Sequence, residues 1–342
     1  MKTFTKFLSF FLVAILLVAS FVGCSPSNNG DESTPAAGNN NGQTNESVTV
    51  RVAGMTGPTG IGLVKMRNDN ENNKKYSFEF FAAGSEIVAK LAKGELDIAT
   101  LPSNLAAVNF NKNNEYIQVL AINTLGVLSI LEVGDTVKSV ADLKGKTILA
   151  PASGKGATPE YALNYILTQN GLDPATDVTI EWKSEVTEII AALKTGNASF
   201  AMLPQPAATN AKSKVDGLNT ALDLNEEWNK IGGDSRLVTG VTVVRKEFAK
   251  AHPEAVKAFL TEYEASTKFV NENVAEAAKL VAKYEIVAEA VALEAIPSCN
   301  ITYIDGGDMK TALSAYLKTL YDANPASVGG KMPSDTFYYA EG

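Results

Sequence analysis

Apolar residues follow two patterns along most of the chain, short continuous runs and runs at helical spacing, which predict strands and helices in turn. The first series has four strands and three intervening helices, expected over residues 48–54, 61–69, 77–82, 85–93, 96–101, 103–110 and 117–122. A strand over 127–133 and a second strand-and-helix series over about 147–222 follow. Beyond a strand over 238–245, helical patterns cover 247–284 and 307–322. Such alternation favours α/β sheets with helices on both faces.

One stretch of this pattern occurs twice. Residues 85–107 and 187–209 align without a gap, at an offset of 102 residues, and both contain a Gly and a Leu-Pro pair at matching positions. Solenoid repeats run about 20–50 residues, so this offset is too long for a solenoid and fits two related domains of ordinary size.

Both copies have the same local signals. Ser85 and Thr187 are predicted as N-caps of the repeated helix, and Gly94 and Gly196 as its left-handed C-terminal residues. A short buried strand follows, and the Leu-Pro pair ends it because proline has no N–H for the sheet. The next polar residues therefore lie at the carboxyl end of a strand, where open α/β sheets bind ligands.

Two glycine-threonine turns mark the same edge in each half. The first spans residues 57–59 after the strand 48–54, and the second spans 156–158 after a strand at 147–150. Each precedes a helical pattern, so it offers backbone amides and hydroxyls to a polar ligand at a helix start. Either turn alone is equally well explained as a tight turn with a good cap. Two copies, paired with two Leu-Pro edges, favour a site between the halves.

The second repeat unit is predicted to be inserted within the first. We expect a first lobe from residues 47–124 and 241–342 and a second lobe from residues 125–240. Two extended segments, near residues 123–128 and 238–241, would then cross between the lobes. Paired crossings of this type allow hinge closure around a ligand.

The N-terminal segment predicts export. Lys2 and Lys6 precede an apolar run over residues 7–22, and the end of this run resembles the bacterial lipobox, with Cys24 as the lipidated cysteine. We expect a signal peptide over 1–24 and a flexible polar tether over 25–46. An uncleaved anchor is the alternative, although the run is short for a membrane span of about 20 residues. A lipid at Cys24 would hold the protein to the outer face of the cell membrane.

Composition excludes several classes of protein. The net charge of −8 gives no basic stripe for nucleic acid, and 45% hydrophobic residues are typical of a globular body. With Cys24 lipidated, Cys299 has no disulfide partner, and neither a zinc spacing nor another metal or cofactor motif is present. The single histidine, His252, and the lack of a supported nucleophile motif argue against an enzyme.

Several of these features together resemble the extracytoplasmic substrate-binding proteins of ABC importers. They are the Gly-x-Thr turn at 57–59, the stretch from Glu86 to Pro102, the segment 125–132 and the Asp-Leu-Lys-Gly-Lys sequence at 142–146. The resemblance covers residues 47–342 and is to the group that supplies thiamine or its precursors, alkanesulfonates, taurine and nitrate. It implies the type II periplasmic-binding-protein-like fold, with two doubly wound lobes joined by two crossing segments. It also implies a monomer that passes a small molecule to a membrane permease and its ATPase.

The resemblance implies a ligand site between the lobes. Its expected residues share the carboxyl edges of the two sheets: Thr56, Gly57, Thr59, Ser103, Asn104, Asn123, Gly156, Thr158, Glu185 and Gln205.

The ligand is predicted from the charged and aromatic residues near these edges. A sulfonate or nitrate site would favour an arginine, and none of Arg51, Arg67, Arg236 and Arg245 falls in a predicted site loop. Aromatic residues such as Trp182, with Glu185 close behind it, favour a thiamine-like or other nitrogen heterocycle, although aromatics more often pack in cores.

Three alternatives stay open. The first is a sulfonate-, taurine- or nitrate-binding importer subunit. The second is an enzyme of thiamine-pyrimidine synthesis on the same fold, which by resemblance would need a histidine and a cysteine cluster. The third is a sensory or adhesive surface protein that uses this fold.

Overall fold

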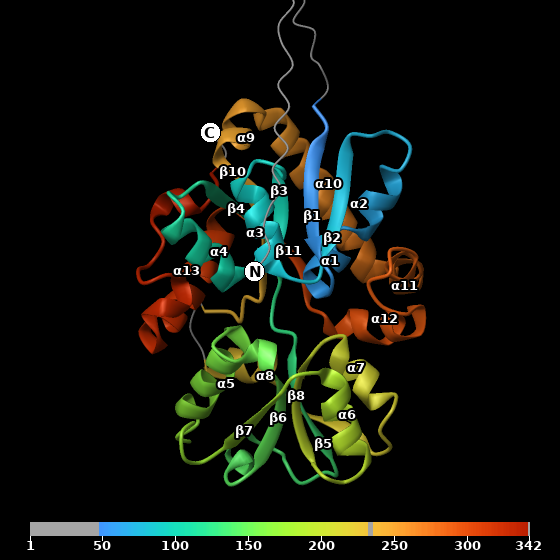
Figure 1. Cartoon of the computed structure of the whole chain (residues 1–342), viewed down its shortest axis with the longest axis vertical. Coiled ribbons are helices and arrows are strands. Elements are labelled where there is room, and N and C mark those ends of the chain that lie inside the picture. Colours follow the sequence, from blue (N-terminus) through green and yellow to red (C-terminus); the bar gives the residue numbers. More distant parts are fainter. Residues whose placement is uncertain (1–47, 232–234, 341–342) are drawn as a thin grey trace, which may run out of the picture. The chain divides into compact units, whose positions relative to one another are not determined.

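The computed structural model describes residues 48–231 and 235–340 (Figure 1). The chain divides into two units, residues 1–46 and 47–342, and the fold below belongs to the second. The predicted signal peptide, the tether and Cys24 lie outside the described residues. Within the described ranges, no helix combines the length and the apolar character that a membrane crossing requires.

Lobe 1 is built on a six-stranded sheet with the order β11-β4-β10-β3-β1-β2. Its strands are β1 (Val50–Met55), β2 (Tyr76–Phe81), β3 (Ile98–Pro102), β4 (Ile117–Thr124), β10 (Gly240–Arg245) and β11 (Ile301–Asp305). The strand β1 is parallel to β2 and β3, whereas β10 runs antiparallel between β3 and β4. The carboxyl ends of β1 and β3 therefore lie at one edge of this sheet.

Helices cover both faces of the lobe 1 sheet (Figure 1). They are α1 (Pro58–Ile61), α2 (Val64–Asp69), α3 (Gly84–Ala92), α4 (Ser103–Lys112), α9 (Lys246–Ala251), α10 (Pro253–Glu272), α11 (Val274–Lys283), α12 (Glu289–Ala295) and α13 (Gly306–Ala323). Apolar residues of α9 and α10 pack on one face, and those of α3, α4 and α13 pack on the other. The helices α11 and α12 form a smaller apolar cluster with residues of α1 and α2.

Lobe 2 repeats this plan on a five-stranded sheet with the order β7-β6-β8-β5-β9. Its strands are β5 (Leu128–Val133), β6 (Thr147–Pro151), β7 (Thr179–Lys183), β8 (Phe200–Pro204) and β9 (Leu218–Asp223), and its helices are α5 (Thr158–Gln169), α6 (Val186–Lys194), α7 (Ala207–Lys212) and α8 (Leu224–Ile231). The helices α6 and α7 pack on one face, and α5 and α8 on the other. Short 3-10 helices lie at Val140–Leu143 and Ala152–Gly154 here, and at Ile296–Ser298, Pro325–Val328 and Asp335–Phe337 in lobe 1.

The internal duplication is visible in the element bounds. The pairs α3 and α6, and β3 and β8, are offset by the 102 residues that separate the repeated stretches. Gly94 and Gly196 have φ of 71° and 73°, as predicted for residues that follow a helix in the left-handed region. This arrangement confirms the α/β class with two doubly wound lobes.

Some local predictions were wrong. The helices α3 and α6 begin earlier than expected, after Ala83 and Glu185, and no side chain caps them. Ser85 and Thr187 therefore lie within the first turn. The helix expected over 61–69 is divided into α1 and α2, with Gly62 and Leu63 between them. The sequence patterns also missed β11 and α12.

Two segments cross between the lobes. The first is residues 125–127, between β4 and β5, and the second joins α8 to β10, with residues 235–239 described. Hydrogen bonds from each lobe hold the first crossing segment. The Leu125 amide donates to the Asn300 carbonyl of lobe 1 at 3.1 Å, and the Gly126 amide donates to Asn225 Oδ1 of lobe 2 at 3.2 Å. One buried apolar cluster continues through both lobes, with Trp228 of α8 against Tyr316 of α13 at 5.5 Å between ring centres.

A buried ion cluster fixes the amino end of β3, away from the strand ends that point toward lobe 2. The Asp97 side chain is 2% exposed and accepts from Arg51 Nε at 2.8 Å and from an Arg245 terminal nitrogen at 3.0 Å. Burial alone would raise the pKa of Asp97, but these hydrogen bonds outweigh it and lower the pKa. Two of the four arginines considered for an anion site therefore serve this structural cluster.

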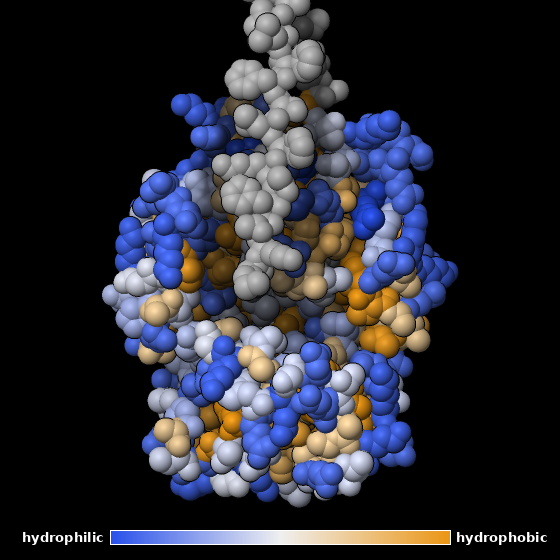
Figure 2. All heavy atoms as spheres, viewed as in Figure 1, coloured by the Kyte–Doolittle hydropathy of each residue, from blue (hydrophilic) through white to orange (hydrophobic). Residues whose placement is uncertain are grey.

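The visible face of the molecule is mostly hydrophilic (Figure 2). Hydrophobic residues gather over α11 and α12, where Leu293 is 47% exposed. A single exposed leucine is ordinary for a protein surface and needs no special explanation.

Candidate functional site

The candidate site is assembled from the carboxyl ends of four strands. In lobe 1, β1 leads into α1 and β3 leads into α4; in lobe 2, β6 leads into α5 and β8 into α7. In lobe 1 the strand β1 lies between β2 and β3, and in lobe 2 the strand β6 lies between β7 and β8, so the strand order reverses at β1 and at β6. Such a reversal is the switch point where open α/β sheets bind ligands.

Three of the predicted residues in lobe 1 lie close together around Gly240. A Cβ atom added to Gly240 would come within 2.3 Å of Thr59 Cγ2 and 2.5 Å of Asn123 Oδ1, so only glycine fits there. Ser103 is fully buried, and its hydroxyl donates to the Val238 carbonyl at 2.6 Å. The start of β10 thus passes between side chains that come from α1, α4 and β4.

Asn123 is held in a defined orientation by its neighbours. Its Nδ2 donates to Thr242 Oγ1 at 3.0 Å, and its Oδ1 accepts from Thr124 Oγ1 at 2.9 Å. Both bonds are buried, so the amide is part of a fixed polar layer beneath the sheet edge.

A direct hydrogen bond joins predicted residues of the two lobes. Thr158 Oγ1, at the first position of α5, donates to Asn104 Oδ1, in the first turn of α4, at 3.3 Å. Neither helix has a side chain that caps its first amides. The N-termini of two helices of ordinary length, one from each lobe, therefore meet at this point. Helix N-termini carry partial positive charge and free amides, so their meeting favours an anion.

Gln205 and Gly156 are occupied by contacts within lobe 2. Gln205 is 5% exposed, and its Oε1 accepts from the Thr209 amide at 3.3 Å and from Thr209 Oγ1 at 2.8 Å, in the first turn of α7. The Gly156 amide donates to Glu160 Oε2 at 2.5 Å, so the chain itself places one negative charge beside the start of α5.

The remaining predicted residues lie further toward solvent. Thr56 is exposed, and its hydroxyl donates to the Phe81 carbonyl at 2.9 Å. Gly57 precedes α1 and adopts a φ of 131°. Glu185 is exposed at the start of α6, and no hydrogen bond within the described chain links it to the residues around Gly240.

The aromatic and carboxylate set expected for a nitrogen heterocycle is not brought together. Trp182 lines a pocket together with Glu160 and Asn164 of α5, and Tyr161 accepts from Asn324 Nδ2 at 3.1 Å. Phe81 lies under Lys90 Nζ, 5.4 Å from its ring centre. The side chains that meet where the α4 and α5 N-termini approach each other are the amide of Asn104 and the hydroxyl of Thr158, with the Glu160 carboxylate beside the start of α5.

Two buried hydroxyls in this region were missed by sequence reasoning. Thr239, on the second crossing segment, accepts from the Ser103 amide at 3.0 Å through its carbonyl, yet its own hydroxyl is buried without a partner in the described chain. The Tyr316 hydroxyl of α13 is likewise buried without a partner there. Tyr316 occupies the apolar stripe of its helix, so spacing alone predicts only a core residue.

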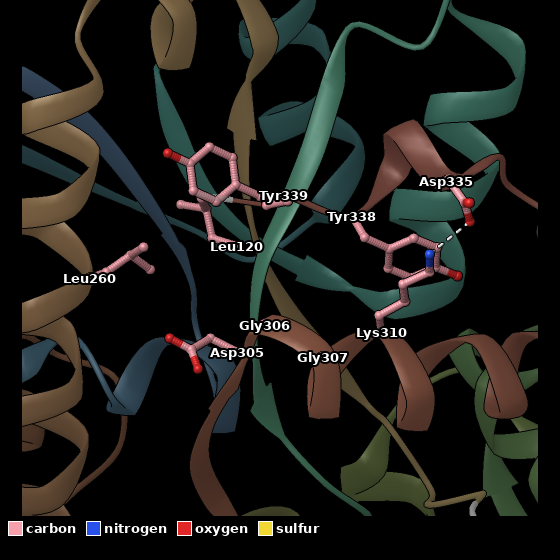
Figure 3. Close-up of a pocket in the computed structure, with 10 residues that line it drawn as sticks. Leu120, Leu260, Asp305, Gly306, Gly307, Lys310, Asp335, Tyr338 and Tyr339 are labelled. Atoms are coloured by element: carbon pink, nitrogen blue, oxygen red, sulfur yellow. Dashed lines mark ion pairs between the residues drawn. The ribbon is translucent and has the colours of Figure 1, made fainter. Parts of the chain in front are cut away.

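A pocket of about 640 Å³ lies elsewhere in lobe 1, between α10, α13 and the segment that follows Asp335 (Figure 3). Its walls are apolar at Leu120 and Leu260, and its rim carries the ion pair between Lys310 Nζ and Asp335 Oδ1, at 3.0 Å. None of the predicted site residues lines it. Within the described ranges, no cluster of three or more metal-ligating side chains occurs.

Comparison with known proteins relates this geometry to one family. Residues 58–286, more than half of the chain, match the model of the NMT1-like family. The chain is 30% identical over 216 residues to the taurine-binding periplasmic protein of Escherichia coli, which covers 63% of this chain and 64% of that relative. The chain thus matches less than two thirds of that relative's length.

Solved structures share the fold. An ABC transporter structure from Parabacteroides distasonis superposes with a TM-score of 0.71 at 22% identity, covering 86% of this chain and 99% of that one. The periplasmic aliphatic sulphonate-binding protein of Escherichia coli superposes with a TM-score of 0.66 at 16% identity, covering 84% and 95%. These likenesses confirm the predicted periplasmic-binding-protein-like fold.

Proposed function

Because the chain belongs to the NMT1-like family, we propose that it is the solute-binding subunit of an ABC importer and that its ligand is a small organic sulfonate of the taurine type. The ligand is captured between the lobes and passed to a membrane permease driven by an ATPase. The 30% identity with a taurine-binding periplasmic protein supports both the role and the ligand class. No step of this role needs a catalytic group.

The observation that carries the choice of ligand is the meeting of the α4 and α5 N-termini at the Asn104–Thr158 hydrogen bond. A sulfonate has three acceptor oxygens and one negative charge, and helix amides with nearby hydroxyls supply donors without an arginine. A ligand that contacts both termini binds the closed state better than the open state and therefore shifts the population toward closure.

The predicted thiamine-like ligand has less support. Its recognition would need a carboxylate beside an aromatic face, whereas Glu185 is exposed at the start of α6 and Trp182 lines a separate pocket beside α5. A thiamine-like cation would also meet the positive ends of α4 and α5. It therefore serves as the competing ligand in the test.

We further propose that Cys24 carries a lipid that holds the protein on the outer face of the cell membrane as a monomer. The lipobox-like end of the N-terminal apolar run supports this location. Cys24→Ser is expected to release the protein from the membrane fraction, and unchanged retention of this variant would contradict the anchor.

The proposed function is tested by a thermal-shift screen of the purified protein with taurine, alkanesulfonates, nitrate and thiamine. A ligand at a hundredfold excess over its Kd stabilises the native state by about 2.7 kcal/mol, which gives a clear rise in the melting temperature. We expect the rise with taurine or an alkanesulfonate. If only thiamine raises the melting temperature, the proposed sulfonate ligand is wrong and a thiamine-like ligand takes its place. If a strain that lacks this gene still grows on these sulfonates as its sulfur source, the transport role is contradicted.

A further inference from the structure

The pocket in lobe 1 opens where one edge strand replaces another beside β4 (Figure 3). The strand β11 ends at Asp305, opposite Ala121, although β4 itself begins at Ile117. The C-terminal segment continues the edge at Val119, whose carbonyl accepts from the Tyr339 amide at 2.9 Å. This change of partner leaves a cavity of about 640 Å³ at the edge of the sheet, between α10 and the start of α13. Small-molecule sites in proteins have volumes of about 300–1,000 Å³, so the cavity is large enough for one.

One side of this pocket is apolar. Leu120 of β4 and Leu260 of α10 line it at exposures of only 1% and 6%, and the ring of Tyr339 stands beside Leu120 (Figure 3). The Asp305 carboxylate lies on the same side of the pocket as Leu260 (Figure 3). Apolar walls with a few polar groups are typical of a site that buries the body of a small organic molecule.

The charged groups of the pocket are not equally paired. Lys310 Nζ forms its ion pair with Asp335 at 3.0 Å and lies 5.8 Å from the centre of the Tyr338 ring, so its charge is already met at the rim. Asp305 accepts from the Tyr303 hydroxyl at 2.9 Å, but no basic side chain within the described ranges forms an ion pair with it. Its side chain does not cap α13 either. The Asp305 carboxylate is therefore available to a ligand.

This charge distribution favours a cation over an anion. The pocket is lined by the carboxylates of Asp305 and Asp335 and by the ammonium of Lys310, which gives a net charge of −1. The start of α13 carries about half a positive charge and offsets only part of it. An anion would be repelled by Asp305, whereas an ammonium group would pair with it. The aromatic ring of Tyr339 adds an attraction for cations.

We propose that this pocket is a second binding site, for a small organic cation that joins an ammonium group to an apolar body. The ammonium group binds the Asp305 carboxylate, and the apolar body packs against Leu120, Leu260 and Tyr339. None of the predicted interlobe residues lines this pocket, so the inference goes beyond the proposed function and does not depend on the ligand held between the lobes.

The test compares probes that share one apolar body and differ in charge. Benzylamine, benzyl alcohol and phenylacetate are titrated into the full chain at low ionic strength, and heats of binding are measured by calorimetry. We expect benzylamine to bind most tightly and phenylacetate least. Added salt should weaken the binding of benzylamine and leave that of benzyl alcohol unchanged, because salt screens a partly exposed ion pair.

Variants locate the site. Asp305→Asn removes the charge but keeps the size of the side chain and its acceptor for the Tyr303 hydroxyl, so the affinity for benzylamine should fall about three- to tenfold. Its affinity for benzyl alcohol should not change. Asp308→Asn is the matched control, because it removes a carboxylate from the first turn of the same helix but does not line the pocket. Tyr339→Leu keeps an apolar wall without the aromatic face and should weaken benzylamine binding about two- to fivefold.

Each outcome bears on the second site separately from the proposed function. If the original protein does not bind benzylamine, or binds phenylacetate as tightly, the cation site is overturned. Equal losses in Asp305→Asn and Asp308→Asn would overturn it as well, because they would show attraction to the acidic protein as a whole. Melting temperatures without ligand show whether each variant is folded. Methanesulfonate is titrated into the same proteins, and its failure to bind would overturn only the proposed interlobe ligand.

Discussion

The bond between Asn104 and Thr158 offers a quantitative test of how the lobes share the ligand. Asn104→Ala and Thr158→Ala each remove one side of a neutral contact of 3.3 Å, which is long for a hydroxyl donor. In the unliganded protein this bond contributes at most about 1 kcal/mol. A loss of that size lowers the melting temperature of a large domain by no more than about 2–4 °C.

The effect on ligand binding should be larger. Each side chain is expected to contact a charged ligand, and hydrogen bonds to charged groups contribute about 1.5–3 kcal/mol. That range corresponds to a loss of affinity of about 10- to 150-fold for each variant. The double variant should lose less than the sum of the two, because both side chains serve one ligand at one contact point.

Titration calorimetry with taurine and thermal melts without ligand measure the two effects separately. Asn197→Ala and Thr195→Ala are matched controls, since Asn197 Nδ2 donates to Thr195 Oγ1 at 3.0 Å on the exposed end of α6. These controls should keep full affinity. Unchanged affinity in Asn104→Ala and Thr158→Ala would refute the proposal that both lobes contact the ligand. A loss of affinity that occurs only together with a large fall in melting temperature would refute it as well.

Three further predictions concern charge and burial. Glu160→Gln removes the carboxylate beside the Gly156 amide, so affinity for a sulfonate should rise about two- to fivefold in calorimetry, and a fall would indicate a cationic ligand. Asp97→Asn leaves two arginines without their buried partner and should cost about 3 kcal/mol in urea unfolding at pH 7. Because the folded pKa of Asp97 is lowered, this difference should begin to shrink below about pH 4, where the unfolded carboxyl is protonated, and should be lost only as the pH falls through the lowered folded pKa; a constant difference would contradict it. Burial raises the pKa of the Cys299 thiol to about 12, so Ellman's reagent at pH 8 should react only with unfolded protein, and rapid reaction of native protein would contradict this burial.

Much of the fold could be predicted because the chain repeats its own pattern. The copies at 85–107 and 187–209 form the same helix and the same following strand in each lobe, so an interpretation that is correct for one copy is also correct for the other. The strand β11 could not be found this way. Its five residues pair with β4, which lies far earlier in the chain, and such pairing leaves no local periodic signal.

For the candidate site, sequence patterns predicted only the strand ends that form its edges. Gly and Leu-Pro signals located the strand ends and with them Ser103, Asn104 and Thr158. The buried hydroxyl of Thr239 lies beside Ser103 on the second crossing segment, more than 130 residues later, and no local sequence pattern indicates this proximity. Glu185 and Trp182 had the right chemistry for a heterocycle, but in the structure Trp182 lines a pocket beside α5 and Glu185 lies exposed before α6.

The most direct measurement of the central claim is a crystal structure of the protein with taurine. The account predicts the sulfonate between the first turns of α4 and α5, with oxygens within hydrogen-bond distance of Asn104 and Thr158. A sulfonate bound at the pocket beside Lys310, or contacts from one lobe alone, would contradict it.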